Sequence, residues 1–141
     1  IPRQARALYE RNWIRLIADI DYEPSPLVPA ANPLTGRPLD LSDAWLRSVS
    51  PIHVEYLQNM GVRASMSVSL LREGRLWGLI ACHHYAGPHE PAYEACATAE
   101  LLGQMLSVRV VEAWKLGGAK LDNGLLVVVA LAERKVRILC H

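Results

Sequence analysis

The sequence predicts one α+β domain in which an antiparallel sheet is flanked by helices. Residues 62–71 and 76–84 are strand-like segments joined by the tight turn Arg72-Glu73-Gly74-Arg75, a pattern typical of a β-hairpin. Segments with helical periodicity lie on both sides of this hairpin. The length of 141 residues suffices for one hydrophobic core without disulfides.

Composition excludes several classes of protein. The chain is 51% hydrophobic and 21% charged with a net charge of +1, so it is neither a disordered tail nor a binder of nucleic acid through phosphates. No apolar run is long enough to span a membrane. The three cysteines lack the spacing of a metal site, which favours a reducing, cytoplasmic location.

The N-terminal part predicts a helix, a strand and a long loop. Gln4–Ala18 has the pattern of an amphipathic helix, with Arg15 on it, and Ala18–Tyr22 alternates as a short strand would. Tyr22–Asp40 contains five of the nine prolines, which neither a helix nor a central strand tolerates. The apolar residues of this segment predict a loop that packs against another part of the protein.

The central part predicts two more helices and the hairpin. Ser42-Asp43 is a candidate N-cap for a short helix over Ala44–Arg47, and Ser50-Pro51 for a helix over Ile52–Met60 that ends at Gly61. Residues 62–71 alternate apolar side chains with Ser65, Ser67 and Ser69, which predicts a strand with one apolar face and one hydroxyl face.

The C-terminal part predicts a long helix and two isolated strands. Ala92–Trp114 has helical periodicity and is long enough to contact a partner as well as the core. Beyond Lys115 the character changes. Leu125–Leu131 and Val136–Leu139 are short β-branched runs that resemble strands separated from their domain.

Cys82 and His83 are the first candidates for chemistry. Adjacent residues of a strand point to opposite faces, so the two side chains are not expected to share a metal site or to act as a nucleophile and its base. The sequence favours a buried structural cysteine beside a half-exposed histidine, and no metal.

Two polar stripes are the second candidates. The three serines of residues 62–71 either form a solvated face or leave room for a bulky ligand that needs hydrogen bonds. Arg47, Ser50, His53 and Tyr56 recur at intervals of three, which predicts one helix face that is either solvated or able to bind a carboxylate. With Arg15 as a second cation, such an arrangement suits a large, planar, dianionic ligand.

Two long motifs then carry a family resemblance. The segments Ser-Pro-Ile-His-Val-Glu-Tyr-Leu-Gln-Asn-Met-Gly-Val (50–62) and Leu-Trp-Gly-Leu-Ile-Ala-Cys-His-His (76–84) resemble the chromophore-binding GAF domain of phytochromes, specifically of bacteriophytochromes. The resemblance covers Ile1 to about Ala113. It implies a GAF-like antiparallel sheet flanked by helices over residues 1–114, with a C-terminal helix leading to an incomplete segment.

The resemblance implies that biliverdin, a linear tetrapyrrole, binds between the sheet, the helices and the long loop. His53 matches the histidine near the pyrrole nitrogens, and His83 the one that bonds the D-ring carbonyl. Arg15 and Arg47 match the arginines that pair with the propionates. The remaining matches are the hydroxyl partners Tyr9, Ser50, Ser65 and Ser67, then Tyr56 beside ring D, and Ile1 and Pro2 from a motif whose backbone contacts the pyrroles.

Further expectations follow from the same resemblance. The module is expected to sense red and far-red light through isomerisation of the C15=C16 bond and to be no enzyme. It is expected to act with PAS and PHY domains, to signal through a histidine kinase, and to form a homodimer through Ala92–Trp114. Ile52 occupies the position of the attachment cysteine of plant members, so the pigment-bonding cysteine is expected upstream. Residues 115–141 are expected to be pieces of a PHY domain or foreign sequence.

Two other functions remain open from the sequence. The domain could be a GAF module without pigment that serves for dimerisation or relay through Ala92–Trp114. Hydrolytic chemistry at Cys82 and His83 is the other alternative, although their opposed directions on a strand disfavour it.

Overall fold

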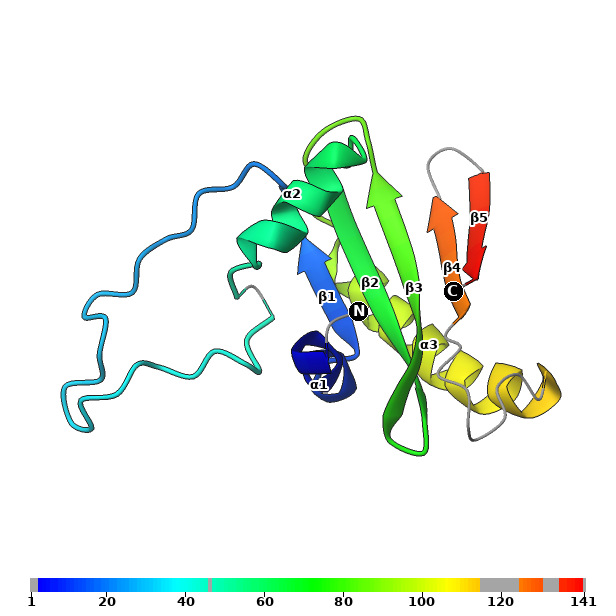
Figure 1. The fold of residues 1–141 in the computed structure, drawn as a ribbon, viewed down its shortest axis with the longest axis horizontal. Helices are drawn as coiled ribbons and strands as arrows, with labels where there is room; N and C mark the ends of the chain where they lie inside the picture. The colour runs from blue at the N-terminus through cyan, green and yellow to red at the C-terminus, as the bar shows by residue number, and fades with distance from the viewer. Residues whose placement is uncertain (1–2, 46, 115–124, 131–134, 141) are drawn as a thin grey trace.

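The computed structural model describes residues 3–45, 47–114, 125–130 and 135–140. In these ranges the helices are α1 (Arg3–Arg11), α2 (Pro51–Asn59) and α3 (Tyr93–Trp114), and the strands are β1 (Ile14–Ile17), β2 (Ala64–Arg72), β3 (Arg75–His84), β4 (Leu125–Ala130) and β5 (Lys135–Cys140). The strands form one sheet in the order β1-β2-β3-β4-β5 (Figure 1). The predicted α+β class and the antiparallel arrangement of β1, β2 and β3 are confirmed.

Helices cover both faces of the sheet (Figure 1). On one face, Val68 of β2 packs with Ile14 of β1 and the buried Cys96 of α3. On the other face, the hydroxyl of Ser69 donates a hydrogen bond to the Tyr9 carbonyl oxygen of α1 at 2.8 Å. Because side chains alternate along β2, one strand contributes to both layers.

The face opposite α3 has its own apolar cluster beneath α2. Ile17 of β1, Ile20, Leu57 of α2 and Val62 are all buried there. The cluster fixes α2 above one end of β1, whereas α1 lies near the other end (Figure 1). The middle of this sheet face therefore lies between two helices.

The predicted helix over Gln4–Ala18 is wrong beyond Arg11. The backbone N–H and side-chain amide of Asn12 both donate to the Leu8 carbonyl oxygen, at 3.0 and 3.1 Å, and the helix ends there. Ile14–Ile17 is instead an edge strand that pairs with β2 and is buried along its whole length. Tertiary pairing overrides the local helical pattern here, so Arg15 belongs to a strand.

Two further predictions about short elements are wrong. Ala18–Tyr22 is a bend and turn, because the Ile20 N–H donates to the Arg63 carbonyl oxygen at 2.9 Å and the side chain enters the core. The helix predicted over Ala44–Arg47 is not formed, since none of its described residues, 44, 45 and 47, is helical. The described part of this segment forms a turn in which the Ala44 N–H donates to the Leu41 carbonyl oxygen at 2.9 Å.

The remaining elements agree with the prediction. The Pro51–Asn59 helix follows Ser50, although the Ser50 side chain makes no capping hydrogen bond, and Gly61 has the positive φ of 71° expected after a helix. The hairpin turn has positive φ at Glu73 and Gly74. No helix in the described part of the chain is long and apolar enough to cross a membrane.

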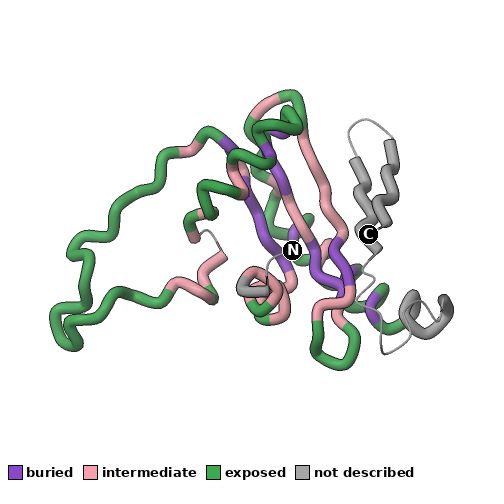
Figure 2. Tube along the Cα trace, in the orientation of Figure 1, coloured by how far each residue is buried: buried purple, intermediate pink, exposed green. Residues whose placement is uncertain are grey.

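The Pro-rich loop between β1 and α2 extends away from the sheet and is exposed (Figure 2). The expectation that its apolar residues pack is wrong, since Val28 is 89% and Leu34 is 95% exposed. Its internal hydrogen bonds are local, as from the Asn32 N–H to the Arg37 carbonyl oxygen at 2.8 Å. The prolines leave few donors for bonds that would draw the loop back.

The two C-terminal strands are confirmed in the backbone. β4 pairs in parallel with β3 at Leu79–Ala81, and β5 pairs with β4 in antiparallel fashion. The predicted strands are thus added to the sheet and are not separate from it. Residue 131, at the end of one predicted strand, lies outside the described residues.

Candidate functional site

Strand register brings four of the predicted site residues onto one face of the sheet. Arg15 of β1 is opposite Ser67 of β2, and Ser65 of β2 is opposite His83 of β3. Side chains alternate between the two faces along a strand, and residues opposite each other on paired strands share a face. By this rule all four point to the same face as Ser69, which contacts α1, and this is the face that α1 and α2 cover. This face is largely shielded from solvent, because Ser65 is 9% and Ser69 0% exposed, while Ser67 and His83 are half-buried.

Arg15 is the charged centre of this face, with 8% of its surface exposed. Its Nη2 atom donates to the carbonyl oxygens of Arg47 at 2.9 Å and Ser48 at 3.2 Å. Its Nη1 atom is buried and has no hydrogen-bond partner. Burial lowers the pKa of Arg15, and the Arg47 charge lowers it further. A buried cationic donor without a partner is a place where a carboxylate would be stabilised.

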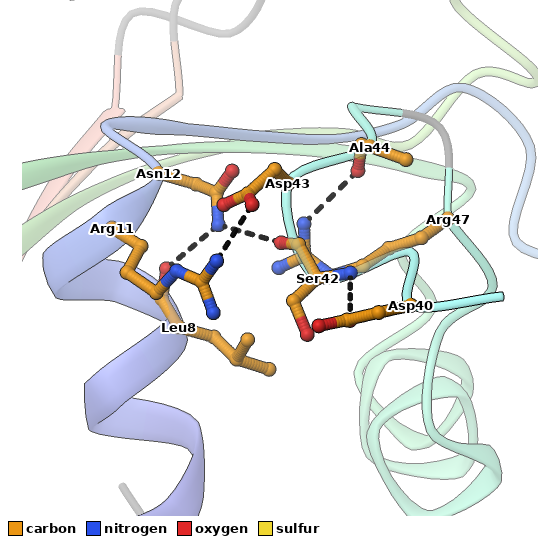
Figure 3. Close-up of polar contacts among 8 residues, drawn as sticks. All are labelled: Leu8, Arg11, Asn12, Asp40, Ser42, Asp43, Ala44 and Arg47. Atoms are coloured by element: carbon orange, nitrogen blue, oxygen red, sulfur yellow. Dashed lines mark hydrogen bonds and ion pairs between the residues drawn. The ribbon is translucent and has the colours of Figure 1, made fainter.

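Arg47 reaches the same region from the segment before α2. Its Nη1 atom donates to the Ala44 carbonyl oxygen at 3.1 Å, as Figure 3 shows. The Tyr22 hydroxyl accepts the Val49 N–H at 2.7 Å and so holds the segment beside β1. The two guanidinium groups lie close enough for the charge of Arg47 to lower the pKa of Arg15.

Two histidines approach this region from different elements. The ring of His53, on α2, stacks on Tyr56 at a centroid distance of 6.3 Å. Burial lowers the pKa of His53, and the Arg15 charge lowers it further. Burial also lowers the pKa of His83 on β3, followed by the effect of His53. Both imidazoles are therefore held neutral near pH 7, each with one donor and one acceptor nitrogen.

These pKa shifts predict a loss of stability in acid. The unfolded chain binds more protons than the folded chain once pH falls below the ordinary histidine pKa of 6.5. The free energy of unfolding should therefore fall as pH is lowered through that value, and the loss should continue down to the lowered folded-state values.

Urea denaturation at pH values above and below that window measures the effect. The double variant His53→Gln, His83→Gln should lose less stability between the two pH values than the unmodified chain. Asn59→Gln, an exposed and non-titrating change on α2, is the control and should leave the pH dependence unchanged. Equal losses in the double variant and the unmodified chain would show that these imidazoles are not responsible.

Fewer contacts define the positions of the other predicted site residues. Ser50, which precedes α2, and Tyr56, which lies on it, are both exposed, Tyr56 to 55%, and the ring of Tyr56 lies beside that of His53. Tyr9 of α1 is half-buried and its phenol raises the pKa of Arg15, as does that of Tyr22. Ile1 and Pro2 lie outside the described residues.

Sequence reasoning missed two contributors to this face. The sequence predicts Tyr22 at the junction of a short strand and the loop, and Asn12 within a helix. An isolated tyrosine in a Pro-rich segment gives no periodic signal, whereas Asn12 has the residue type that commonly ends a helix.

Neither a metal site nor an activated cysteine is seen in the described ranges. No group of three His, Cys, Asp or Glu side chains there could hold a metal ion. Cys82 is opposite Met66, whereas the neighbouring His83 is opposite Ser65, so the two side chains point to different faces. Burial raises the pKa of the Cys82 thiol, which makes it a poor nucleophile.

Comparison with protein families gives two matches. The GAF domain family matches residues 7–110, which include the second half of α1, all of α2, the strands β1 to β3 and most of α3. The TPM domain family matches residues 97–141. The second match overlaps the first only on α3.

Relatives and solved structures agree on the first match. Cyanobacterial phytochrome B of Nostoc sp. is 58% identical over 78% of this chain, and a bacteriophytochrome of Xanthomonas campestris is 47% identical over 91%. The chromophore-binding domain of a bacteriophytochrome from R. palustris superimposes with a TM-score of 0.77 at 49% identity, covering 83% of this chain and 39% of that one. The chain spans 14% and 20% of the length of the two relatives.

Proposed function

The chain belongs to the GAF domain family, among the domains of phytochromes, and from this we propose that it is the bilin-binding module of a red and far-red photoreceptor. The observation that carries the proposal is the unpartnered Nη1 atom of Arg15, buried on a sheet face that also receives Arg47, His53 and His83. A ligand with two carboxylates and several polar ring nitrogens would use these groups.

Biliverdin is the ligand that fits this set of residues. Arg15 and Arg47 would pair with its two propionates, and Ser65 and Ser67 offer hydroxyls beside Arg15 on the same face. His53 would lie near the pyrrole nitrogens and His83 would donate to the D-ring carbonyl, since a neutral imidazole provides either partner. Tyr9, Ser50 and Tyr56 complete the proposed set, with the backbone of Ile1 and Pro2.

Bound biliverdin would supply light absorption and isomerisation about its C15=C16 double bond. The protein's own part is to bind and orient. The buried Arg15 and the half-buried Arg47 would hold the carboxylates at fixed positions, and the helices above the sheet would partly shield the half-buried histidines from water. We propose no catalytic turnover for this chain; a sensor of this kind changes the hydrogen bonds around His83 and passes the change to neighbouring domains.

We assign covalent attachment of the pigment and the output of the signal to residues other than these 141. Position 52 is isoleucine, which cannot form a thioether, and its side chain is 78% exposed. We propose that a cysteine upstream bonds the pigment and that PAS and PHY domains and a histidine kinase complete the receptor. Residues 1–114 would form the GAF domain. The TPM match to residues 97–141 supports a different origin for the last part of the chain.

A titration with biliverdin tests the proposal. Binding should move the pigment's long-wavelength band to the red and sharpen it, and red light should change the bound spectrum. Because biliverdin would bind only the folded chain, the midpoint of thermal unfolding should rise with its concentration. A spectrum identical to that of free biliverdin, with no change in the midpoint, would contradict the proposal.

A second candidate function, dimerisation without pigment, is favoured by the exposed apolar side of α3. Leu101, Leu102, Met105 and Val108 are each more than half exposed, which is unusual for a helix packed on a sheet. We propose that α3 forms a homodimer. Size-exclusion chromatography with light scattering on the titration samples should show a dimer with and without biliverdin. A dimer that binds no biliverdin would favour the relay function alone.

A further inference from the structure

Two contacts join the end of α1 to the turn that precedes Arg47, here called the α1 clasp (Figure 3). The side-chain amide of Asn12 donates to the Ser42 carbonyl oxygen at 3.0 Å while it also ends α1 at Leu8. The Arg11 Nη2 atom lies 2.6 Å from the Asp43 Oδ2 atom. The clasp lies where the long exposed loop returns to the fold.

The clasped turn leads directly to the Arg47 guanidinium. The Ser42 N–H donates to the Asp40 carboxylate at 2.9 Å, and the Ala44 N–H to the Leu41 carbonyl oxygen at 2.9 Å. The Ala44 carbonyl oxygen then accepts a hydrogen bond from the Arg47 Nη1 atom. A series of short contacts therefore runs from the end of α1 to this cation (Figure 3).

The same segment also fixes Arg15. The carbonyl oxygens of Arg47 and Ser48 accept both hydrogen bonds of the Arg15 Nη2 atom, which leaves Nη1 as the free donor. Trp45 packs on the opposite face of the sheet, against the cluster of Ile14, Val68 and Cys96. Its ring is edge-on to that of Tyr93, with 6.4 Å between the ring centroids. The Trp45 indole holds the segment against the sheet, and the α1 clasp holds the turn before Arg47 in place.

We propose that Arg11, Asn12 and Asp43 are positioning residues for a dicarboxylate ligand and act through the guanidinium groups of Arg47 and Arg15. This inference rests on the proposed function. Without the clasp, the end of a long exposed loop would have to become ordered when the ligand binds. The entropic cost of this ordering would lower the affinity for the ligand. With it, both cations are preorganised in the free protein.

The test uses two clasp variants and a matched control in the full chain. Asn12→Asp keeps the shape but places an acceptor against two carbonyl oxygens, and Asp43→Asn removes the ion pair. The control is Asp21→Asn, which removes the Asp21–Arg63 ion pair, also exposed and 2.7 Å long. The dissociation constant of biliverdin should rise about tenfold for Asn12→Asp and about threefold for Asp43→Asn. It should stay unchanged for Asp21→Asn.

Three further measurements separate positioning from a general loss of stability. Biliverdin dimethyl ester, which lacks free carboxylates, should bind the clasp variants and the unmodified chain equally. Asn12→Asp should have a smaller effect in an Arg47→Ala background than in the unmodified chain, because only the route through Arg15 then remains. The charge exchange Arg11→Asp, Asp43→Arg should restore the affinity that Asp43→Asn loses.

The outcomes that overturn the inference differ from those that overturn the function. Clasp variants that bind biliverdin as tightly as the unmodified chain, or that lose as much affinity for the dimethyl ester, would overturn the positioning role while the proposed function stands. If Asn12→Asp does not fold, Asp43→Asn and the charge exchange still decide the matter. An unmodified chain that binds no biliverdin would overturn the proposed function and this inference together.

Discussion

Replacement of Arg15 by methionine is expected to lower the affinity for biliverdin by about a hundredfold or more. The side chain is 8% exposed and provides the only buried cationic donor without a partner that the described residues contain. Removal of one partner of a buried, hydrogen-bonded charge pair typically costs this much, because the carboxylate loses its counterion in a region without water. Arg15→Lys should keep part of the affinity, since it keeps the charge but not the planar donors.

The same variant should change the stability of the pigment-free chain by less than about 1 kcal/mol. Loss of the bonds to the Arg47 and Ser48 carbonyl oxygens destabilises the fold, whereas removal of a buried charge beside a second arginine stabilises it. Biliverdin titration and urea denaturation measure the two effects separately. Arg63→Met, at an exposed ion pair, is the control. Unchanged affinity in Arg15→Met would show that this cation does not bind the pigment.

Gly103→Val is expected to destabilise the fold by about 3 kcal/mol. A Cβ atom at position 103 would lie only 2.4 Å from the Val68 Cγ1 atom and 3.3 Å from the Ser69 carbonyl oxygen. α3 would have to move away from β2 to make room. That movement would break the hydrogen bond from the Leu71 N–H to the Ser107 hydroxyl, which is 3.0 Å long.

Urea denaturation of Gly103→Val and Gly103→Ala measures this effect, with the smaller loss expected for alanine. Gly87→Ala is the matched control, because an added Cβ atom there meets nothing within 4 Å. In a Val68→Ala background Gly103→Ala should cost less stability than it does in the unmodified chain, since the atom that clashes is absent. A fully stable Gly103→Val protein would show that α3 does not pack closely on β2.

The comparison between sequence and structure is clearest at Arg15. The alternation of Ser65, Ser67 and Ser69 alone was enough to place the serines on one face of a strand. The spacing of Arg47, Ser50, His53 and Tyr56 predicts one helix face, and this prediction is wrong for the first two, which precede α2 in non-helical backbone. The segment of Arg15 has a helical pattern in sequence but is a strand in the structure, since β2 offers it a full set of backbone partners. Local periodicity does not contain that information.

The exposure of the serine face is the second such case. From sequence, a row of small hydroxyls fits either a solvated strand or a ligand site, because both avoid bulky apolar side chains. The tertiary structure shows that Ser65 and Ser69 are buried and Ser67 is half-buried. It also shows that the Ser69 hydroxyl donates to the Tyr9 carbonyl oxygen, while Ser65 and Ser67 lie opposite His83 and Arg15.

The sequence by itself determined the family, the hairpin, α2 and α3, because these depend on motifs and on periodicities of two and 3.6 residues that lie within one segment. The tertiary structure decided that α1 ends at Asn12 and that the turn at Ser42 meets it. It also decided that Arg15 is left with one free, buried donor. The contacts of Asn12 with Ser42 and of Arg15 with Arg47 join groups about thirty residues apart, and such contacts form only when the sheet and helices bring distant segments together.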